Sequence, residues 1–396
     1  EDGGTKAESS TWQAHVGSTL VMSHEKEWVE QCIVRLKKET TKEPEGHPVC
    51  NLNFPLSELI RTVIAEEQET PSDDVDIEML FEALGLMGIE NFSAVVELQE
   101  SGLVVDSHLR AADLSKGIFT ILDLRPSELP SVDFIPENMA SIEVGRFNLL
   151  RFWQEIPNVL AIAMPEVKPQ FDMVLTIIQQ QAGIDLEQDL LAHLGTEYIS
   201  FSVTEGSAQT SVVAVELKDG AAFRTGLETA LAAPALQPQV AAVLEIEPFL
   251  DHTIYSIKNQ PPEEAIAFGV TGDYLLYGQP DGLRQVIRNQ SSEGASVGSY
   301  ENSPLVKGLR KHVPPGAFGF GAIDWKQYMS VIIQELARPD YFAAVEQEWA
   351  QSGFAVPPPR FDKLPPADHI ASFFNVSYLY AEAVKDGIHQ RIMLNY

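Results

Sequence analysis

Leu186-Glu-Gln-Asp-Leu-Leu-Ala-His-Leu194 is followed at once by Gly195 and then by the alternating stretches Tyr198–Val203 and Ser211–Leu217. Apolar residues at helical spacing indicate a helix, and a glycine directly after them is typical of a helix C-terminus. Alternation of apolar and polar residues on both sides of the polar segment Glu205–Ala208 predicts two antiparallel strands. This stretch therefore predicts a helix that ends at a glycine and leads into a β-hairpin.

The same arrangement recurs elsewhere in the chain. A helix predicted over Asp76–Leu84 ends at Gly85 and precedes the alternating stretches Phe92–Leu98 and Leu103–Leu109. Asp-Gly between alternating strands is among the stronger local signals for a hairpin. Two further hairpins are predicted: Phe373–Ala383 with Ile388–Leu394 around Lys385-Asp386-Gly387, and Ala265–Val270 with Tyr274–Gly278, which turns at Gly272-Asp273 and leads into a helix over Asp281–Asn289.

A second pattern is a short strand that runs directly into an amphipathic helix. The examples are Ser18–Ser23 into His24–Leu36, Ala140–Gly145 into Phe147–Val159, and Ala317–Ile323 into Asp324–Leu336. In the last of these, apolar residues repeat at helical spacing after Asp324, a favourable N-cap. Together the two patterns predict an α+β fold of two to three diverged repeats, each with antiparallel β-hairpins and amphipathic helices on one face.

Domain boundaries are predicted at proline-rich and polar stretches. Pro126–Pro136 and the loop Gln290–Pro304 separate the recurring patterns. The expected organisation is a flexible N-terminal segment (1–11), a first α+β unit (12–135), a second unit (136–290) and a partial third unit (291–396) that completes a sheet.

The balance of charge excludes several kinds of partner. The chain has 57 acidic and 27 basic residues, a net charge of −30, so it is not expected to bind nucleic acid or an anionic membrane surface. Its apolar stretches, such as Val159–Met164, are far shorter than the ~20 residues of a membrane helix, so no membrane insertion is expected. Residues 301–396 are nearly neutral, with 10 acids and 9 bases, which favours the C-terminal quarter for self-association.

One serine hydrolase pattern can be traced. Ser23 and Lys26 form a Ser-x-x-Lys pair, and Tyr300-Glu-Asn302 and Lys385-Asp386-Gly387 follow in the order of the motifs of penicillin-binding enzymes. The context argues against it, because Lys385 lies in a predicted turn and Tyr300 in a predicted loop. Gly294-Ala-Ser-Val-Gly298 matches a nucleophile elbow but also lies in a polar loop, not between a strand and a helix. No catalytic residue is therefore assigned.

No cofactor or metal site is predicted. The acidic run Glu66–Glu82 lacks the spacing of a calcium loop and fits a solvated loop that caps the next helix. The nine histidines form no zinc pair, His193 is expected in a hydrophobic environment, and no phosphate-binding glycine loop is present. Val356-Pro-Pro-Pro359 fits a linker better than a polyproline ligand. Cys32 and Cys50 allow one disulfide bridge if the chain is exported.

Several segments carry a family resemblance: Glu143–Trp153, Gly183–Leu190, Leu194-Gly195-Thr-Glu197, Ala267–Gly278 and Asp281–Ile287. Over residues 140–330 the chain resembles a bacterial family of exported proteins of unknown function. The resemblance implies α+β repeats and an extracytoplasmic location, in the periplasm or at the cell surface. The polar start of the chain, at Glu1 and not at Met, agrees with removal of a targeting segment.

The sequence thus favours an exported, soluble, non-catalytic binding or structural module over an enzyme. The expected ligand is a protein, a peptide or an apolar molecule bound on the sheets, with Phe318, Phe320, Tyr378 and Tyr380 as candidate exposed aromatics. The alternative is a serine hydrolase of the penicillin-binding type that uses Ser23 and Lys26.

Overall fold

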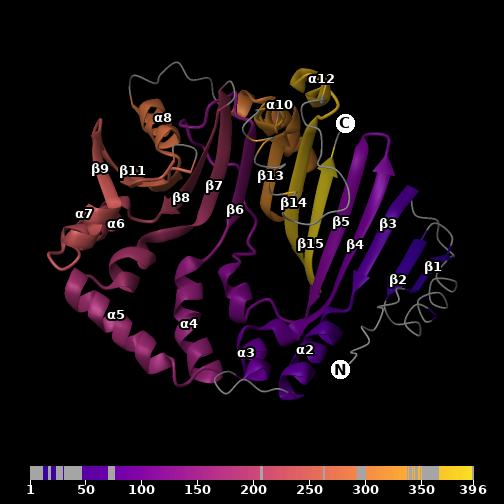
Figure 1. The fold of residues 1–396 in the computed structure, drawn as a ribbon, viewed down its shortest axis with the longest axis horizontal. Coiled ribbons are helices and arrows are strands. Elements are labelled where there is room, and N and C mark those ends of the chain that lie inside the picture. Colours follow the sequence, from indigo (N-terminus) through magenta and orange to yellow (C-terminus); the bar gives the residue numbers. More distant parts are fainter. Residues whose placement is uncertain are drawn as a thin grey trace.

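The computed structural model describes residues 12–16, 19–23, 30, 47–69, 76–205, 208–261, 264–291, 300–336 and 365–394, together with residues 338, 341, 343, 347 and 349. In this part of the chain, one antiparallel sheet of 13 strands runs through all three predicted units (Figure 1). The mixed α and β character predicted from the sequence is confirmed. A separate pair of strands, β1 (Trp12–Val16) and β2 (Thr19–Ser23), lies beside it.

The order of the strands differs from their order in the chain. From one edge to the other the sheet comprises β3 (His47–Phe54), β4 (Ile89–Gln99), β5 (Gly102–Ala111), β15 (Gly387–Leu394), β14 (Val376–Val384), β13 (Ala317–Asp324), β6 (Ser141–Arg146), β7 (Leu194–Glu205), β8 (Ala208–Leu217), β12 (Tyr274–Gly278), β11 (Ala267–Thr271), β10 (His252–Ile257) and β9 (Leu244–Phe249). The three C-terminal strands are thus inserted between those of the first and second units, and β15 pairs with β5.

Helices follow the strands in the order α2 (Leu56–Glu69), α3 (Ile77–Ala83), α4 (Leu149–Ala163), α5 (Lys168–Ala182), α6 (Gly220–Ala232), α7 (Gln237–Val243), α8 (Pro280–Gln290), α9 (Pro304–His312), α10 (Trp325–Leu336) and α12 (Ala367–Ala371). Shorter turns are η1 (Leu86–Gly88), η2 (Gly117–Ile121), η3 (Leu186–Leu190), η4 (Leu191–His193) and η6 (Tyr300–Asn302). In Figure 1, α2 to α5 lie along the lower edge of the sheet, and α8, α10 and α12 near its upper edge.

One regular helix predicted from the sequence is absent. Residues Leu186–His193 form the wide turn η3 and the tight turn η4, and Leu194 already begins β7. The turn is held by Asp185, whose side chain accepts hydrogen bonds from the amides of Glu187 and Gln188, both at 3.0 Å. This is an ordinary cap, but the backbone after it forms a wide turn and a tight turn in place of a regular helix, and the apolar spacing alone did not distinguish these forms. The helix predicted over His24–Leu36 lies outside the described residues.

The main hydrophobic core lies on one face of the sheet. Alternate residues of β6 and β7, such as Ile142 and Phe201, point to this face, where α8, α9 and residues 126–139 cover them. Ser141 and Ser202 alternate with these residues and so point to the opposite face, where Tyr328 of α10 contacts both hydroxyl groups at 3.1 and 2.7 Å. Helices therefore cover both faces, and the expectation of helices on one face is wrong.

The proline-rich segment expected to mark a domain boundary is part of this core. Phe134 is 1% exposed and contacts the rings of Tyr274 and Phe201, with centroids 5.3 and 6.3 Å apart. The hydroxyl of Ser127 donates to the carbonyl of Phe318 at 2.7 Å, and Tyr300 donates to the carbonyl of Pro130. The prolines of this segment therefore belong to an extended stretch of chain that covers the sheet. The division into units stays a prediction.

Truncation of Phe134 tests this packing. We expect Phe134→Leu to lower the free energy of unfolding by about 1.5 kcal/mol, because the smaller side chain leaves part of an aromatic cluster unfilled. Urea denaturation followed by circular dichroism measures the change. Phe373→Leu, at an exposed phenylalanine, is the matched control and should shift stability by less than about 0.5 kcal/mol. If Phe134→Leu and Phe373→Leu change the free energy of unfolding by equally small amounts, residues 126–139 do not belong to the core.

Candidate functional site

The residues of the predicted serine hydrolase do not assemble within the described part of the chain. Ser23 ends β2, outside the large sheet, whereas Tyr300 is buried in the main core and Lys385 lies in the turn between β14 and β15. Lys26 and the loop Gly294–Gly298 lie outside the described residues, as does Cys32. Tyr300 was expected in a loop; it instead begins η6, and its ring is buried in the core.

The aromatic residues expected to form an exposed binding surface are buried. Phe318, Phe320, Tyr378 and Tyr380 are all at most 8% exposed. Phe320, Tyr378 and Tyr380 share the core-facing side of β13 and β14, because Phe320 pairs with Tyr380 and Ala322 with Tyr378. The prediction failed because α9 covers this face of β13 and β14. The position of α9 could not be predicted from the sequence.

The acidic and histidine residues considered for metal binding have other roles. Asp76 caps α3 and accepts a hydrogen bond from the amide of Met79 at 2.9 Å, as expected for a helix cap. His193 is the last residue of η4 and is half-buried. Among the residues that the structure describes, no group of three or more His, Cys, Asp and Glu side chains is placed to hold a metal ion.

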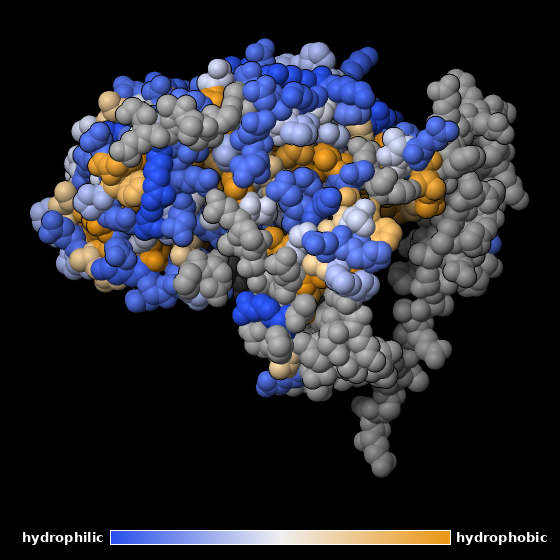
Figure 2. Space-filling model, turned by 90° about the horizontal axis from the view of Figure 1, so that it is seen from above, coloured by the Kyte–Doolittle hydropathy of each residue, from blue (hydrophilic) through white to orange (hydrophobic). Residues whose placement is uncertain are grey.

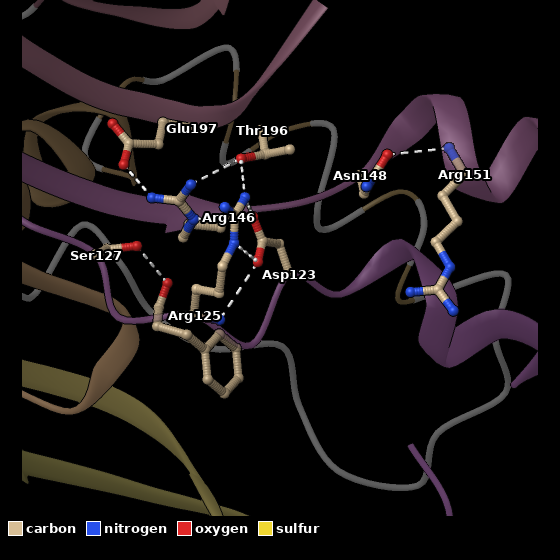
Figure 3. Close-up of polar contacts among 9 residues, drawn as sticks. Asp123, Arg125, Ser127, Arg146, Asn148, Arg151, Thr196 and Glu197 are labelled. Carbon is tan, nitrogen blue, oxygen red and sulfur yellow. Dashed lines mark hydrogen bonds and ion pairs between the residues drawn. The ribbon is translucent and has the colours of Figure 1, made fainter. Parts of the chain in front are cut away.

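Arg146, at the end of β6, is the centre of the most connected polar cluster (Figure 3). Its Nε donates to Oδ2 of Asp123 at 3.0 Å, its Nη2 donates to Oγ1 of Thr196 at 2.9 Å, and its Nη1 pairs with Glu197. Arg125 donates to the other oxygen of Asp123, Oδ1, at 2.7 Å. The Arg146 and Asp123 side chains are only 13% and 8% exposed. This cluster binds the segment before β6 to both β6 and β7.

The electrostatics of Asp123 follow from these contacts. The hydrogen bond from Arg125 is the largest cause, with further bonds from Arg146 and Thr196, and together they hold the pKa of this carboxyl well below its usual range although burial alone would raise it. Asp123 is therefore ionised at neutral pH and its oxygens are occupied by donors. The cluster is suited to fixing structure, not to accepting a proton from a substrate.

A pocket of about 590 Å³ opens beside this cluster. Its walls are residues 111–115, residues 120–125, the start of α4 and the turn between β14 and β15. Three cationic side chains line it: Arg125, Arg151 and Lys385. No motif in the sequence indicates this pocket, because each of the three cations comes from a different part of the chain.

A second polar cluster joins strands that are distant in the sequence. His389 of β15 lies between Glu382 of β14 and Asp106 of β5, with both nitrogen–oxygen distances at 3.0 Å. Arg391 donates to both oxygens of Asp106, at 2.7 and 2.8 Å. Burial raises the pKa of Asp106, but the bonds from Arg391 and His389 outweigh it and the pKa is lowered. All four side chains are half-buried on the sheet, so the cluster stabilises strand pairing across β14, β15 and β5.

Exposed apolar residues gather on α5. Met173, Val174, Ile177 and Ile178 are between 37% and 57% exposed. Their spacing of i, i+1, i+4 and i+5 places all four on one side of the helix, which we call the α5 apolar face. By contrast, Figure 2 shows the molecule from the end opposite α5, where hydrophobic residues form separate patches among hydrophilic ones.

Comparisons with models of protein families, with curated proteins and with solved structures find no match for this chain. No relative therefore supplies a catalytic or binding residue. In the described part of the chain, no helix has the length and apolar character needed to cross a membrane.

Proposed function

We propose that this chain is a non-catalytic binding protein that contacts a protein partner through the α5 apolar face. The observation that carries the proposal is the exposure of Met173 and Val174, at 57% and 49%, on the same side of the helix as Ile177 and Ile178. When a partner covers contiguous apolar side chains of this kind, they are removed from water, and this burial favours binding. Single exposed apolar residues would carry no such argument.

The position of α5 supports this use. Phe171, which lies beside Val174 and Ile178 around the helix, holds α5 to the rest of the molecule: its ring contacts Trp153 of α4 with centroids 5.9 Å apart. Ile162, near the end of α4, and Val167, the N-cap of α5, are also exposed. An amphipathic helix that presents its apolar side outward fits recognition by a groove on another protein.

Charge limits the identity of the partner. Residues 101–200 carry 14 acids and 6 bases, and Glu166 is exposed beside Val167. An anionic membrane would be repelled, and a second copy would place acidic surfaces against each other. The complementary partner is a different protein, with an apolar centre and a basic rim.

Site-specific photo-crosslinking in the native host tests the proposal. A photoreactive phenylalanine analogue at Ile177 should yield a discrete crosslinked product, whereas the same analogue at Gln179, on the opposite side of α5, should not. Adding Met173→Asp and Val174→Asp should abolish the product at Ile177 and leave the urea midpoint unchanged, since both residues are exposed. Identical products from both positions, or products that survive these two changes, would contradict the proposal.

We also propose that the fold comprises three diverged repeats. Each would consist of one strand, one or two helices and a hairpin: β3–α2–α3–β4–β5, β6–α4–α5–β7–β8 and β13–α10–α12–β14–β15. In support, each set occupies three adjacent positions of the sheet with its single strand at one side. The remaining strands, β9 to β12, would be an addition to the second repeat.

The enzymatic alternative is testable with serine-reactive probes. We expect neither a labelled penicillin nor a fluorophosphonate to modify the purified protein, because the other motifs are not placed for catalysis: Tyr300 is buried in the core and Lys385 lies in the turn between β14 and β15. Intact-protein mass spectrometry measures the adduct. Labelling that disappears in Ser23→Ala, but persists in the control Ser101→Ala in an exposed turn, would establish the hydrolase instead.

The proposed location is outside the bacterial cytoplasm. It rests on the resemblance of residues 140–330 to an exported family. Fractionation of host cells is the test, and a protein pool confined to the cytosol would contradict it. If the chain is exported, Cys50, which is exposed, is available for a disulfide bridge with Cys32.

A further inference from the structure

We propose that the pocket beside the start of α4 binds the phosphoryl group of a small phosphorylated molecule, held by Arg151 and Lys385. This site is separate from the α5 apolar face, so either proposal can fail without the other. It rests on three properties of the pocket: fixed walls, uncompensated positive charge, and a helix start that carries a cation in place of an acid.

The walls of the pocket are held by hydrogen bonds. Oδ1 of Asp113 accepts from the amide and the hydroxyl of Ser115, at 2.8 and 2.6 Å, which fixes the first wall. The amide of Ala111 donates to the carbonyl of Asp386 at 3.1 Å and thus joins this wall to the turn that carries Lys385. The amide of Asn148 donates to the carbonyl of Ile121 at 2.6 Å and so positions the start of α4. A site with such support needs little reorganisation on binding.

Two positive charges in the pocket have no carboxylate partner among the described residues. Arg125 is paired with Asp123, and Asp113 with Lys116 at 3.4 Å, so these charges offset one another. The hydrogen bond of Arg151 is instead to a backbone oxygen, that of Ser115, at 3.3 Å. Lys385 forms no ion pair with any residue that the structure describes. Both side chains are exposed, and in a chain of net charge −30 they give this pocket a local positive potential that favours an anion.

The start of α4 reinforces this charge. The first turn of a helix favours acidic residues because its free amides give it a partial positive charge. The first turn of α4 contains no acid, and its third residue is Arg151, whose amide donates to Oδ1 of Asn148 at 3.0 Å. Arg151 therefore lies where it disfavours the helix. Figure 3 shows its side chain extending from the start of α4, apart from the Arg146 cluster.

The ligand class follows from the count of charges. A phosphate monoester carries about −1.5 to −2 at neutral pH and presents three acceptor oxygens, which matches two uncompensated cations. The planar fork of Arg151 suits two of these oxygens, and Lys385 provides a point charge. A carboxylate would neutralise only one of the two cations. A pocket of about 590 Å³ exceeds the needs of a phosphate ion, so it accommodates an attached organic group.

Calorimetric titration with phenyl phosphate and with inorganic phosphate at low salt tests the proposal. We expect saturable binding of both to the wild-type protein, about tenfold weaker binding in Arg151→Gln and in Lys385→Gln, and about hundredfold weaker binding in the double variant. Lys311→Gln, at an exposed lysine of α9 outside the pocket, should bind like the wild type. Sodium acetate should bind more weakly than phosphate.

Thermal denaturation supplies a second, independent readout. Without phosphate, Arg151→Gln should melt at the same or a higher temperature than the wild type, because an unfavourable charge at a helix start is removed. With phenyl phosphate, the wild type and Lys311→Gln should gain more stability than Arg151→Gln or Lys385→Gln, whose binding is about tenfold weaker. Absence of saturable binding by the wild type, equal binding by Arg151→Gln, or preference for acetate over phosphate would overturn the proposal.

Discussion

Asp123→Ala is expected to lower the free energy of unfolding by about 3 kcal/mol. The substitution removes the carboxylate that accepts from both Arg125 and Arg146. Arg125 is exposed and can turn to water, but the Arg146 side chain is 13% exposed and would keep only Glu197 and Thr196 as partners. A buried charge that loses one partner of its ion pair typically costs 3–5 kcal/mol, and the remaining partner reduces the loss to the lower part of that range.

Urea denaturation measures this change, and the chain offers a matched control. Asp172→Ala removes a carboxylate that pairs with Lys168 at 2.5 Å on the exposed surface of α5, where its side chain is 51% exposed. Such exposed pairs contribute less than about 0.5 kcal/mol. Similar losses for Asp123→Ala and Asp172→Ala would show that the Arg146 cluster is not a stabilising element of the fold.

The same cluster predicts a dependence of stability on pH. Because the folded protein holds the pKa of Asp123 below its ordinary value of about 3.9, the unfolded chain binds a proton more readily than the folded one. The stabilisation is therefore complete above the unfolded pKa and is lost as pH falls from about 5 to 2. We expect Asp123→Asn to flatten this part of the stability profile. A profile identical to that of the wild type would contradict the assignment.

Local elements were accessible from the sequence, because the signals that define them are close together in the chain. β14 and β15 pair around Asp386-Gly387, and α10 begins directly after Asp324, where alternation and capping place them. The edge strand β9 was not predicted, although Leu244–Phe249 alternates around Pro248. A proline is tolerated at this position because β9 has a neighbour on one side only.

The order of the strands was not accessible, since it depends on contacts between distant residues. Nothing near Asp106 in the sequence shows that it pairs with Arg391, 285 residues later, yet this contact fastens β15 to β5. The strand before the first hairpin was assigned to Ser18–Ser23, whereas the large sheet uses β3, followed by α2. Both segments satisfy the strand pattern, and only tertiary packing distinguishes them.

The pocket beside α4 was beyond sequence reasoning for a related reason. Arg125, Arg151 and Lys385 each lie in a polar, solvent-exposed setting that occurs throughout an acidic protein. Their significance is the shared pocket, which requires the turn of the C-terminal hairpin to contact residues 111–115. Motifs register spacing within a segment, so they cannot detect charges that the fold brings together from three segments.

Gly117→Ala is expected to destabilise the protein by about 3 kcal/mol, because Gly117 lies in close contact with the backbone of Leu84. Gly117 has a φ of +55°, and a β-carbon on it would overlap the carbonyl group of Leu84. The adjoining amide of Ile118 donates to that carbonyl at 3.0 Å, so the backbones cannot separate without losing a hydrogen bond. An unfavourable backbone conformation and a steric overlap at one site account for a loss of this size.

Gly88→Ala is the control for this prediction, because Gly88 lies in the same region but its added β-carbon would meet only the amide nitrogen of Asp113, at an ordinary 3.9 Å. It should change stability by less than about 1 kcal/mol in urea denaturation. Amide hydrogen exchange adds a local test, since protection of Ile118 should fall in Gly117→Ala and not in Gly88→Ala. Equal effects of the two substitutions would mean that the close contact between Gly117 and Leu84 does not exist in solution, and that η2 and the adjoining pocket wall are held by the side chains around them alone.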